Sequence, residues 1–334
     1  MKPNATRLRR LLLDQGLSGA SIDAAWPGWW AEDDDTSGES RAKLRRALSR
    51  RLGLSPEGLA GDRVEFVWRD DDARFKHLRS ESAPELAALA SFGSAVAGYL
   101  LDASGSARGL PAINAQALRA AMLTIAPWID LSGLLEVTWG LGIPVAHLRV
   151  FPLAAKAMQA MVVAREDRYA ILLGRDASYP APIAFTLAHE LGHVAAGHLA
   201  GAQALVDFDP GEAVDTGQHD AEERDADRFA LALLTGSPEP VVEPGAHQFS
   251  GVGLAKAAIA AGRDRGIEPG TLALVLGHQA GRFDIANEAL AGIYDRPRSM
   301  WQAINAVAAE KLGRDQLDPD SAEYLGRVLG WPAA

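Results

Sequence analysis

The residues best suited to chemistry are His189, Glu190 and His193, which stand in an H-E-x-x-H arrangement. An α-helix repeats every ~3.6 residues, so side chains four positions apart lie on one face. The two imidazoles can therefore bind one metal ion, and Glu190 lies beside that face. Zinc lowers the pKa of a coordinated water from about 15.7 to about 7, and a neighbouring carboxylate can take its proton as the water attacks a carbonyl. The pattern predicts a hydrolytic metal centre.

A motif this short also occurs by chance, in ordinary buried helices with two hydrogen-bonded histidines. Three features favour a metal site. The flanking positions are apolar, so the helix should be buried, and a charged Glu190 inside it needs a partner. A third ligand is available downstream, and a strand-like run, 169–173, lies just upstream.

A catalytic zinc site needs a third protein ligand, with water in the fourth position. On the predicted helix 221–234, Ala226 and Ala230 belong to an apolar face, and Glu223 falls near it by helical spacing. Glu223 should therefore point inward. Glu222 lies about 100° away around the helix and should point elsewhere.

Four other polar features lie near the two helices. His198 is out of register for a third histidine ligand, so we interpret it as a helix-end residue favoured by the dipole. His219 is a weaker rival to Glu223 as ligand. Asp227, one turn on from Glu223, either accepts a hydrogen bond from a ligand histidine or is an acid on the helix surface. The stretch 207–212 reads as an exposed acidic loop.

Several segments, in the same order, resemble the ImmA/IrrE family of bacterial and phage metallopeptidases. They are Gly142-Ile-Pro-Val145, Ala170-Ile-Leu-Leu173, Phe185 to His193, and Glu223-Arg-Asp-Ala-Asp-Arg-Phe-Ala230. The resemblance covers roughly residues 130–240 and is poor in the N-terminal segment. It implies a zincin-like fold with one zinc ion held by His189, His193 and Glu223. Glu190 would be the general base and then the proton donor to the leaving amine.

The resemblance also implies a substrate class and further site residues. Members of the family often cleave a helix–turn–helix repressor encoded nearby, in stress or mobile-element responses. The segment 266–278 is similar to one that follows the metal core in many members, so His278 is a candidate for stabilising the oxyanion, although a packed or surface histidine is the simpler interpretation. Tyr169 is a second such candidate. Zinc is favoured by the ligand types, although two histidines and a carboxylate suit other divalent ions.

Composition sets the class of protein. The chain has 334 residues, 48% hydrophobic and 23% charged, as in an ordinary soluble globular protein. A net charge of −10 argues against a nucleic-acid surface along the whole chain. The absence of cysteine excludes disulfides, thiolate zinc ligands and a cysteine nucleophile. There is no apolar signal core and no apolar run of about 18 residues, so we expect a cytoplasmic protein with no membrane segment.

We expect an α+β fold in three parts. Residues 1–80 form an N-terminal accessory segment that can be read as helix–turn–helix-like, with a short strand at 64–68. Residues 81–240 hold the core, zincin-like by its resemblance, in which the metal helix lies against a small mixed sheet. The strand 169–173 would lie at the sheet edge, where a substrate strand could pair with it. Residues 241–334 form a helical C-terminal region.

Two features of the N-terminal segment suggest other functions. A helix that begins at Ser40 and ends at Gly53 carries the basic residues Arg41, Lys43, Arg45, Arg46, Arg50 and Arg51. Contact with DNA through Arg41–Arg51 would make the protein a regulator with the zincin domain as sensor or scaffold, but a solvated face or a dock for an acidic surface of the same protein is favoured.

The second feature is the cluster of Trp26, Trp29 and Trp30. It would be the interface of a partner-binding toxin component in a two-gene module, or, as we favour, an anchor that packs this arm onto the protein. The intact ligand set and Glu190 argue against an inactive enzyme.

Overall fold

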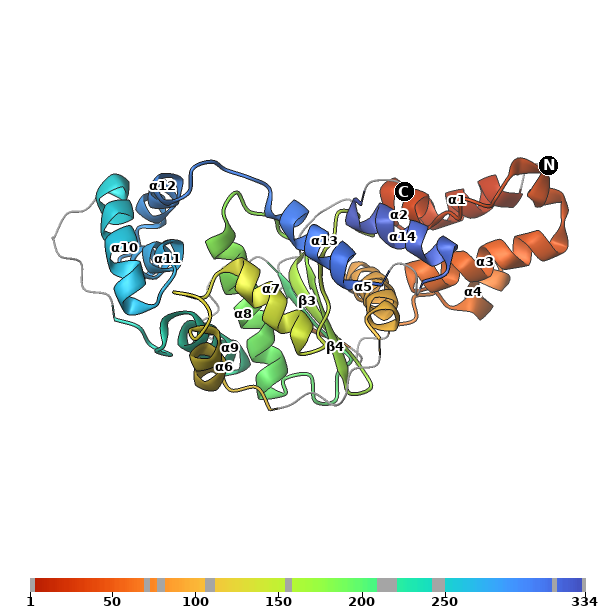
Figure 1. Cartoon of the computed structure of the whole chain (residues 1–334). Coiled ribbons are helices and arrows are strands. Elements are labelled where there is room, and N and C mark those ends of the chain that lie inside the picture. The colour runs from red at the N-terminus through yellow and green to blue at the C-terminus, as the bar shows by residue number, and fades with distance from the viewer. Residues whose placement is uncertain are drawn as a thin grey trace.

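The computed structural model describes residues 4–68, 73–76, 82–105, 112–153, 158–208, 221–241, 250–313 and 317–331. Within these ranges, helices α1–α14 surround one five-stranded mixed sheet (Figure 1). The N-terminal helices lie at one end of the molecule, α10–α12 at the other, and the sheet between them. The α+β fold class is confirmed, and it is consistent with a zincin-like domain flanked by helical segments.

The sheet has the order β1-β5-β3-β4-β2. Its strands are β1 (Ala73–Lys76), β2 (Val145–His147), β3 (Met158–Arg165), β4 (Arg168–Leu173) and β5 (Ala204–Phe208). Strand β3 runs antiparallel to β4 and β5, whereas β1 is parallel to β5 and β2 is parallel to β4. Strand β4 therefore lies inside the sheet, and the prediction that 169–173 forms its edge was wrong, because β2 pairs with the side of β4 that would have been free.

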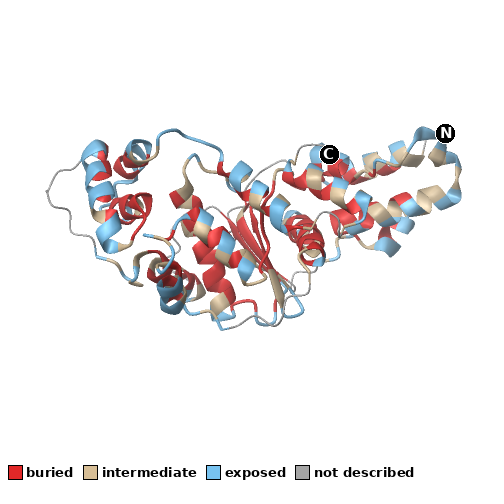
Figure 2. Cartoon of the chain, viewed as in Figure 1, coloured by how far each residue is buried: buried red, intermediate tan, exposed pale blue. Residues whose placement is uncertain are grey.

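Both faces of the sheet are covered, so most residues of its central strands are buried (Figure 2). Alternate residues of β3 belong to different core clusters: Met161 and Val163 to one, Ala160 and Val162 to the other. The first cluster includes helix α5 (Ala83–Ala103) and the second includes α8 (Pro180–Ala196). Among the described helices, α5 alone is long and apolar enough to cross a membrane, but 67% of the window is buried inside the protein, as in a core helix.

Helix α8 runs along one face of the sheet and is held by neighbours on its other sides. It packs against α7 (Leu131–Gly140) and, most extensively, against α9 (Ala221–Thr235), which α6 (Ala115–Met122) supports in turn. Pro180 and Pro182 lie in the first turn of α8, where a missing N–H costs no hydrogen bond. Gly197 ends the helix with φ of +71°, a left-handed conformation that favours glycine.

The N-terminal helices and the last two helices of the chain share one core with the sheet. The N-terminal helices are α1 (Asn4–Asp14), α2 (Gly19–Ala25), α3 (Gly38–Leu52) and α4 (Pro56–Ala60), with a 3-10 turn at Glu32–Thr36. The C-terminal helices are α10 (Gly251–Arg265), α11 (Pro269–Gln279), α12 (Phe283–Ile293), α13 (Met300–Lys311) and α14 (Pro319–Leu329). Helices α10–α12 pack on one another, whereas α13 contacts β2 and α14 contacts α2 and α5. The division at 80 and 240 stays a prediction.

Two local expectations in the N-terminal segment need correction, and one strand was missed. The N-cap of α3 is Ser37, not Ser40, and its hydroxyl accepts the N–H of Ser40 at 3.3 Å. Residues 64–68 form no strand; Phe66 makes only an isolated bridge with Leu54. Strand β1 was not predicted, because four residues with few apolar side chains give too little pattern.

The basic face of α3 is largely engaged within the protein. Three of its side chains bind neighbouring groups: Arg41 the carbonyl of Asp35, Arg45 the carboxylate of Asp62, and Arg51 that of Asp320. Two more cations, Lys43 and Arg50, lie over the rings of Trp29 and Tyr99. These contacts support docking within the same protein, and contact with DNA stays a prediction.

The tryptophan cluster packs onto the core. Trp26, Trp29 and Trp30 are half-buried and contact the apolar cluster that includes α1–α3 and α14. The rings of Trp29 and Trp30 meet edge to face at 6.2 Å. This packing agrees with the anchor interpretation.

Arg51 joins three helices at the base of the N-terminal region. It is 2% exposed, and its guanidinium donates to the carbonyls of Ala25 and Asp320, each at 2.9 Å. The Asp320 carboxylate lies 2.5 Å away, and the Tyr324 hydroxyl donates to the Arg51 carbonyl. The Arg51 side chain therefore donates hydrogen bonds to backbone carbonyls in the last residue of α2 and in the first turn of α14.

Replacing Arg51 with alanine should lower the free energy of unfolding by at least about 2 kcal/mol, because buried carbonyls lose their donor and Asp320 loses its counter-charge. Urea denaturation followed by circular dichroism measures the change. Arg46→Ala, an exposed position on the same helix, is the matched control and should change stability by no more than about 0.5 kcal/mol. Equal effects of the two substitutions would contradict this account of Arg51.

Candidate metal centre

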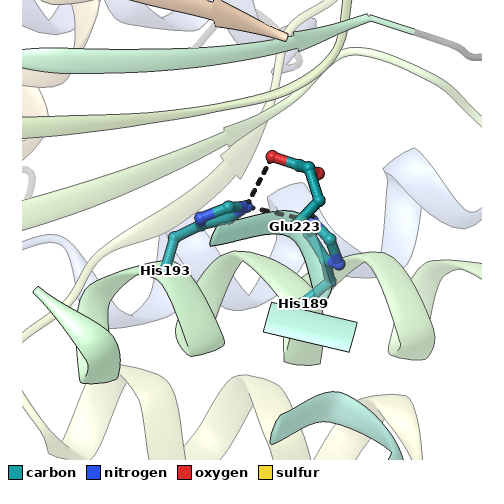
Figure 3. Close-up of side chains that lie close together, drawn as sticks. All are labelled: His189, His193 and Glu223. Atoms are coloured by element: carbon teal, nitrogen blue, oxygen red, sulfur yellow. Dashed lines mark hydrogen bonds and ion pairs between the residues drawn. The ribbon is translucent and has the colours of Figure 1, made fainter. Parts of the chain in front are cut away.

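Helix α8 buries the H-E-x-x-H motif between the sheet and α9. His189 and His193 lie one turn apart on the face that meets α9, and Glu223 comes from the first turn of α9 (Figure 3). All three side chains are buried. Their ligand atoms converge on one point, as Figure 3 shows for the sticks of the three residues.

The distances between these atoms fit a tetrahedral metal ion. The Nε2 atoms of His189 and His193 lie 3.0 Å apart, and the Glu223 carboxylate oxygens lie 3.4 and 3.5 Å from them. Ligands at about 2.0–2.1 Å from a tetrahedral zinc ion are separated by about 3.3 Å. The donor set of two imidazoles and one carboxylate is also that of a catalytic zinc site.

The other nitrogen of each ligand histidine has a partner. The Nδ1 of His189 lies 2.9 Å from Asp227 Oδ1, so the hydrogen bond considered for Asp227 is present. The Nδ1 of His193 lies 2.9 Å from the Nδ1 of His198. Such contacts orient a metal-binding imidazole and leave its Nε2 lone pair facing the ion.

His198 therefore does more than end a helix. The left-handed turn at Gly197 returns the chain toward α8, which brings the His198 ring to 5.0 Å from that of His193. The clue in the sequence was the glycine four residues after His193. Our interpretation of His198 considered only its position along the helix dipole and missed this turn.

The surroundings of the histidines favour a cation between them. Burial lowers the pKa of His193 to about 3, and the neighbouring charge of His189 acts in the same direction, so this imidazole stays neutral as a ligand must. Burial also acts to lower the pKa of His189, but hydrogen bonds to Asp227 and Glu223 outweigh it and raise that pKa well above its usual value. The carboxylates around the two histidines thus favour a positive charge between them, which either a proton on His189 or a metal ion can supply.

Glu190 lies beside the three ligands and is fully buried. Neither carboxylate oxygen has a hydrogen-bond partner among the described residues. Burial raises its pKa to about 8; the charge of His189 lowers this pKa, whereas Asp207 and Glu223 raise it further. Burying a carboxylate without a hydrogen-bond donor destabilises the folded protein, so such a group calls for an explanation, and a catalytic role is one.

Two further groups of the sheet face this site. Asp207 of β5 is buried, and one of its oxygens lies within 4.8 Å of ligand atoms of His189 and Glu190. Lys76 of β1, its partner in the sheet register, places its ammonium 3.8 Å from Glu223 and 2.9 Å from Glu222. Asp207 and Phe208 are thus in a buried strand, not in the exposed loop expected at 207–212, whose other residues lie outside the described ranges.

Glu222 does not reach the ligand cluster, as its position around the helix predicted. Its carboxylate binds Arg74 at 2.7 Å as well as Lys76. It therefore holds β1 against α9.

Gly192, within the motif, allows α9 to approach. A Cβ atom at this position would lie 3.0 Å from Ala226 Cα and 3.1 Å from Phe229 Cβ. These distances are tighter than ordinary contact, so any side chain here would push away the helix that carries Glu223 and Asp227.

The structure does not bring the two oxyanion candidates into the cluster. His278 is exposed at the end of α11, where its ring meets the edge of Phe283 at 5.8 Å. Tyr169 is half-buried on β4, opposite Ala164, and packs against the second core cluster. No described contact joins either residue to the ligands, and both roles stay predictions. His219, the rival ligand, lies outside the described residues.

A helix with two histidines, a glutamate from the next helix and a supporting sheet define a metallopeptidase-type domain. Residues 144–239 match the model of the Peptidase_M78 family, described as the IrrE N-terminal-like domain. The resemblance to the ImmA/IrrE family is therefore confirmed over this part of the chain, which includes the three candidate ligands and β2–β5. No curated protein and no solved structure matches the chain.

Glu223→Ala should abolish tight metal binding, because two imidazoles alone leave the ion without its third protein ligand. Metal content after dialysis, measured by mass spectrometry, should fall from about one ion per chain to near zero. Asp225→Ala is a better control than a change at Glu222, since Asp225 is an exposed acid on the same helix and Glu222 binds β1. Retention of metal by Glu223→Ala would exclude this carboxylate as a ligand.

Gly192→Ala should weaken metal binding and lower stability by about 1–3 kcal/mol, because the added methyl group overpacks the contact between α8 and α9. Gly98→Ala is the matched control, a helical glycine whose added Cβ would meet only Arg165 at 3.6 Å. That change should be neutral or stabilising by up to about 1 kcal/mol, since alanine favours the helix. Thermal unfolding and zinc titration measure both effects; a neutral Gly192→Ala would show that α9 can move freely.

Proposed function

We propose that this protein is a zinc-dependent endopeptidase of the ImmA/IrrE type, which hydrolyses a peptide bond in another protein. The observation that carries the proposal is the position of Glu190. Its carboxylate is fully buried, has no hydrogen-bond partner among the described residues and lies beside three converging ligand atoms. A carboxylate kept in that place suits a group that exchanges protons with substrate and water.

A zinc ion bound by His189, His193 and Glu223 would lower the pKa of water and polarise the substrate carbonyl. The chain's own residues do the rest. The carboxylate of Glu190 accepts a proton from the attacking water and delivers it to the nitrogen of the leaving amine. Burial acts to raise the pKa of Glu190, so that in its ionised form this carboxylate is a stronger base than a solvated glutamate. Asp227 and His198 keep the two imidazoles oriented.

The substrate we propose is a regulatory protein, such as a helix–turn–helix repressor encoded near this gene. Support comes from the resemblance to the ImmA/IrrE family. A cytoplasmic location and a role in a stress response or toxin–antitoxin module belong to the same proposal. Zinc is proposed as the native metal because of the donor set.

Glu190→Gln should retain the metal and lose hydrolysis by about 10²–10⁴-fold, because the amide cannot accept the proton of water. The assay incubates zinc-loaded protein with helix–turn–helix regulators encoded nearby and with unfolded casein, and detects new termini by mass spectrometry. Chelation of the metal should give the same loss. Asp225→Asn, at an exposed position on α9, serves as the control. Undiminished cleavage by Glu190→Gln would remove Glu190 from the mechanism.

A further inference from the structure

A large cavity opens beside the metal helix. It has a volume of about 1000 Å³ and is bounded by the first two turns of α8 and by faces of α9, α11 and α12. One face of α9 and one face of α11 line the cavity, because the lining residues are four apart in the sequence: Asp227 and Leu231 on α9, and Leu274 and His278 on α11. Three segments of the C-terminal half thus aim side chains into one space next to α8.

Apolar side chains dominate this wall, and several are poorly covered. Phe185, Leu231 and Leu274 are only half-buried. At the rim, Phe283 is 57% exposed and Val241 is 79% exposed. Large apolar side chains gathered around an open cavity are typical of a site that an apolar group covers.

Several polar groups of the wall already have partners in the protein. Asp176 accepts the N–H groups of Ala177 and Trp301 at 2.9 and 3.1 Å. Glu239 binds Arg228. The hydroxyl of Thr271 donates to Glu268 at 3.2 Å. These three groups make hydrogen bonds or ion pairs within the protein, and most of the surface that the cavity exposes to an occupant is apolar.

The cavity lies next to the candidate metal centre and shares one residue with its surroundings. Asp227 belongs to its wall and also bonds the Nδ1 of His189. Phe185, one turn before His189 on α8, lines the cavity, and its ring lies 6.4 Å from that of His189. If a substrate peptide bond lay at the metal, a side chain one or two residues from that bond could therefore enter the cavity.

We propose that this cavity receives a bulky apolar side chain, leucine-like or phenylalanine-like, of the peptide substrate close to the cleaved bond. The inference rests on the proposed function. The cavity is larger than one side chain, so it also has room for the adjoining backbone. Selectivity for bulky apolar residues at the cleavage site follows.

The test uses zinc-loaded protein and three probes, the hydroxamates of acetyl-phenylalanine, acetyl-leucine and acetyl-alanine. The hydroxamate binds the metal in each probe, and only the side chain differs. Isothermal titration should show the phenylalanine and leucine probes binding at least about tenfold tighter than the alanine probe, as expected for burying a large apolar side chain. In Leu274→Trp, which fills the cavity, this preference should fall to about one, with the alanine probe unaffected.

Two controls protect the result. Ile259→Trp places the same bulk at a half-exposed position of α10, in the same helical bundle but outside the cavity, and should keep the preference. Leu274→Ala removes wall surface without added bulk and should reduce the preference in a folded protein, as thermal unfolding would verify.

The outcomes separate the two proposals. Equal affinities for all three probes in the wild type, or a preference unchanged by Leu274→Trp, would overturn the assignment of the cavity and leave the metal centre intact. Failure of every hydroxamate to bind zinc-loaded protein would overturn the proposed function as well.

Discussion

Ionisable groups packed together out of water are the constraint on which the rest of this structure depends. His189, Glu190, His193 and Glu223 are each less than a tenth exposed. Burial of such groups is costly unless charges are balanced and hydrogen bonds are made. The fold meets this requirement from several directions: Asp227 and His198 bond the outer nitrogens of the histidines, and a metal ion would balance the carboxylates between them.

Rigid neighbours allow this arrangement to persist. Helix α8 is enclosed by the sheet on one side and by α7 and α9 on others, and Gly192 permits the closest contact with α9. Side chains carried on helices that cannot shift are held in place more accurately than those on loops. The apolar cavity lies where α8 and α9 meet α11 and α12. Under the two proposals, the helices that would hold the metal would therefore also form part of the wall that receives the substrate.

Local patterns in the sequence predicted much of the centre. The H-E-x-x-H spacing and the apolar face of 221–234 identified the three converging side chains. Contacts between distant segments were not predictable in the same way. Strand β1 and the internal place of β4 depend on which strands pair, which no short window encodes. His198 was misjudged because a single left-handed residue, Gly197, changes the direction of the chain.

The part of the chain that is recognisable as a family member is smaller than the unit that folds. Strand β1, which pairs with β5 and supplies Lys76 and Arg74 to Glu222, comes from outside residues 144–239. Asn305 on α13, also outside, bonds both backbone groups of His147 on β2. Excised alone, residues 144–239 would have an unpaired strand edge on β5, prone to pairing with other chains. A transfer of this domain into another protein would therefore have to include β1 and the flanking helices, such as α13.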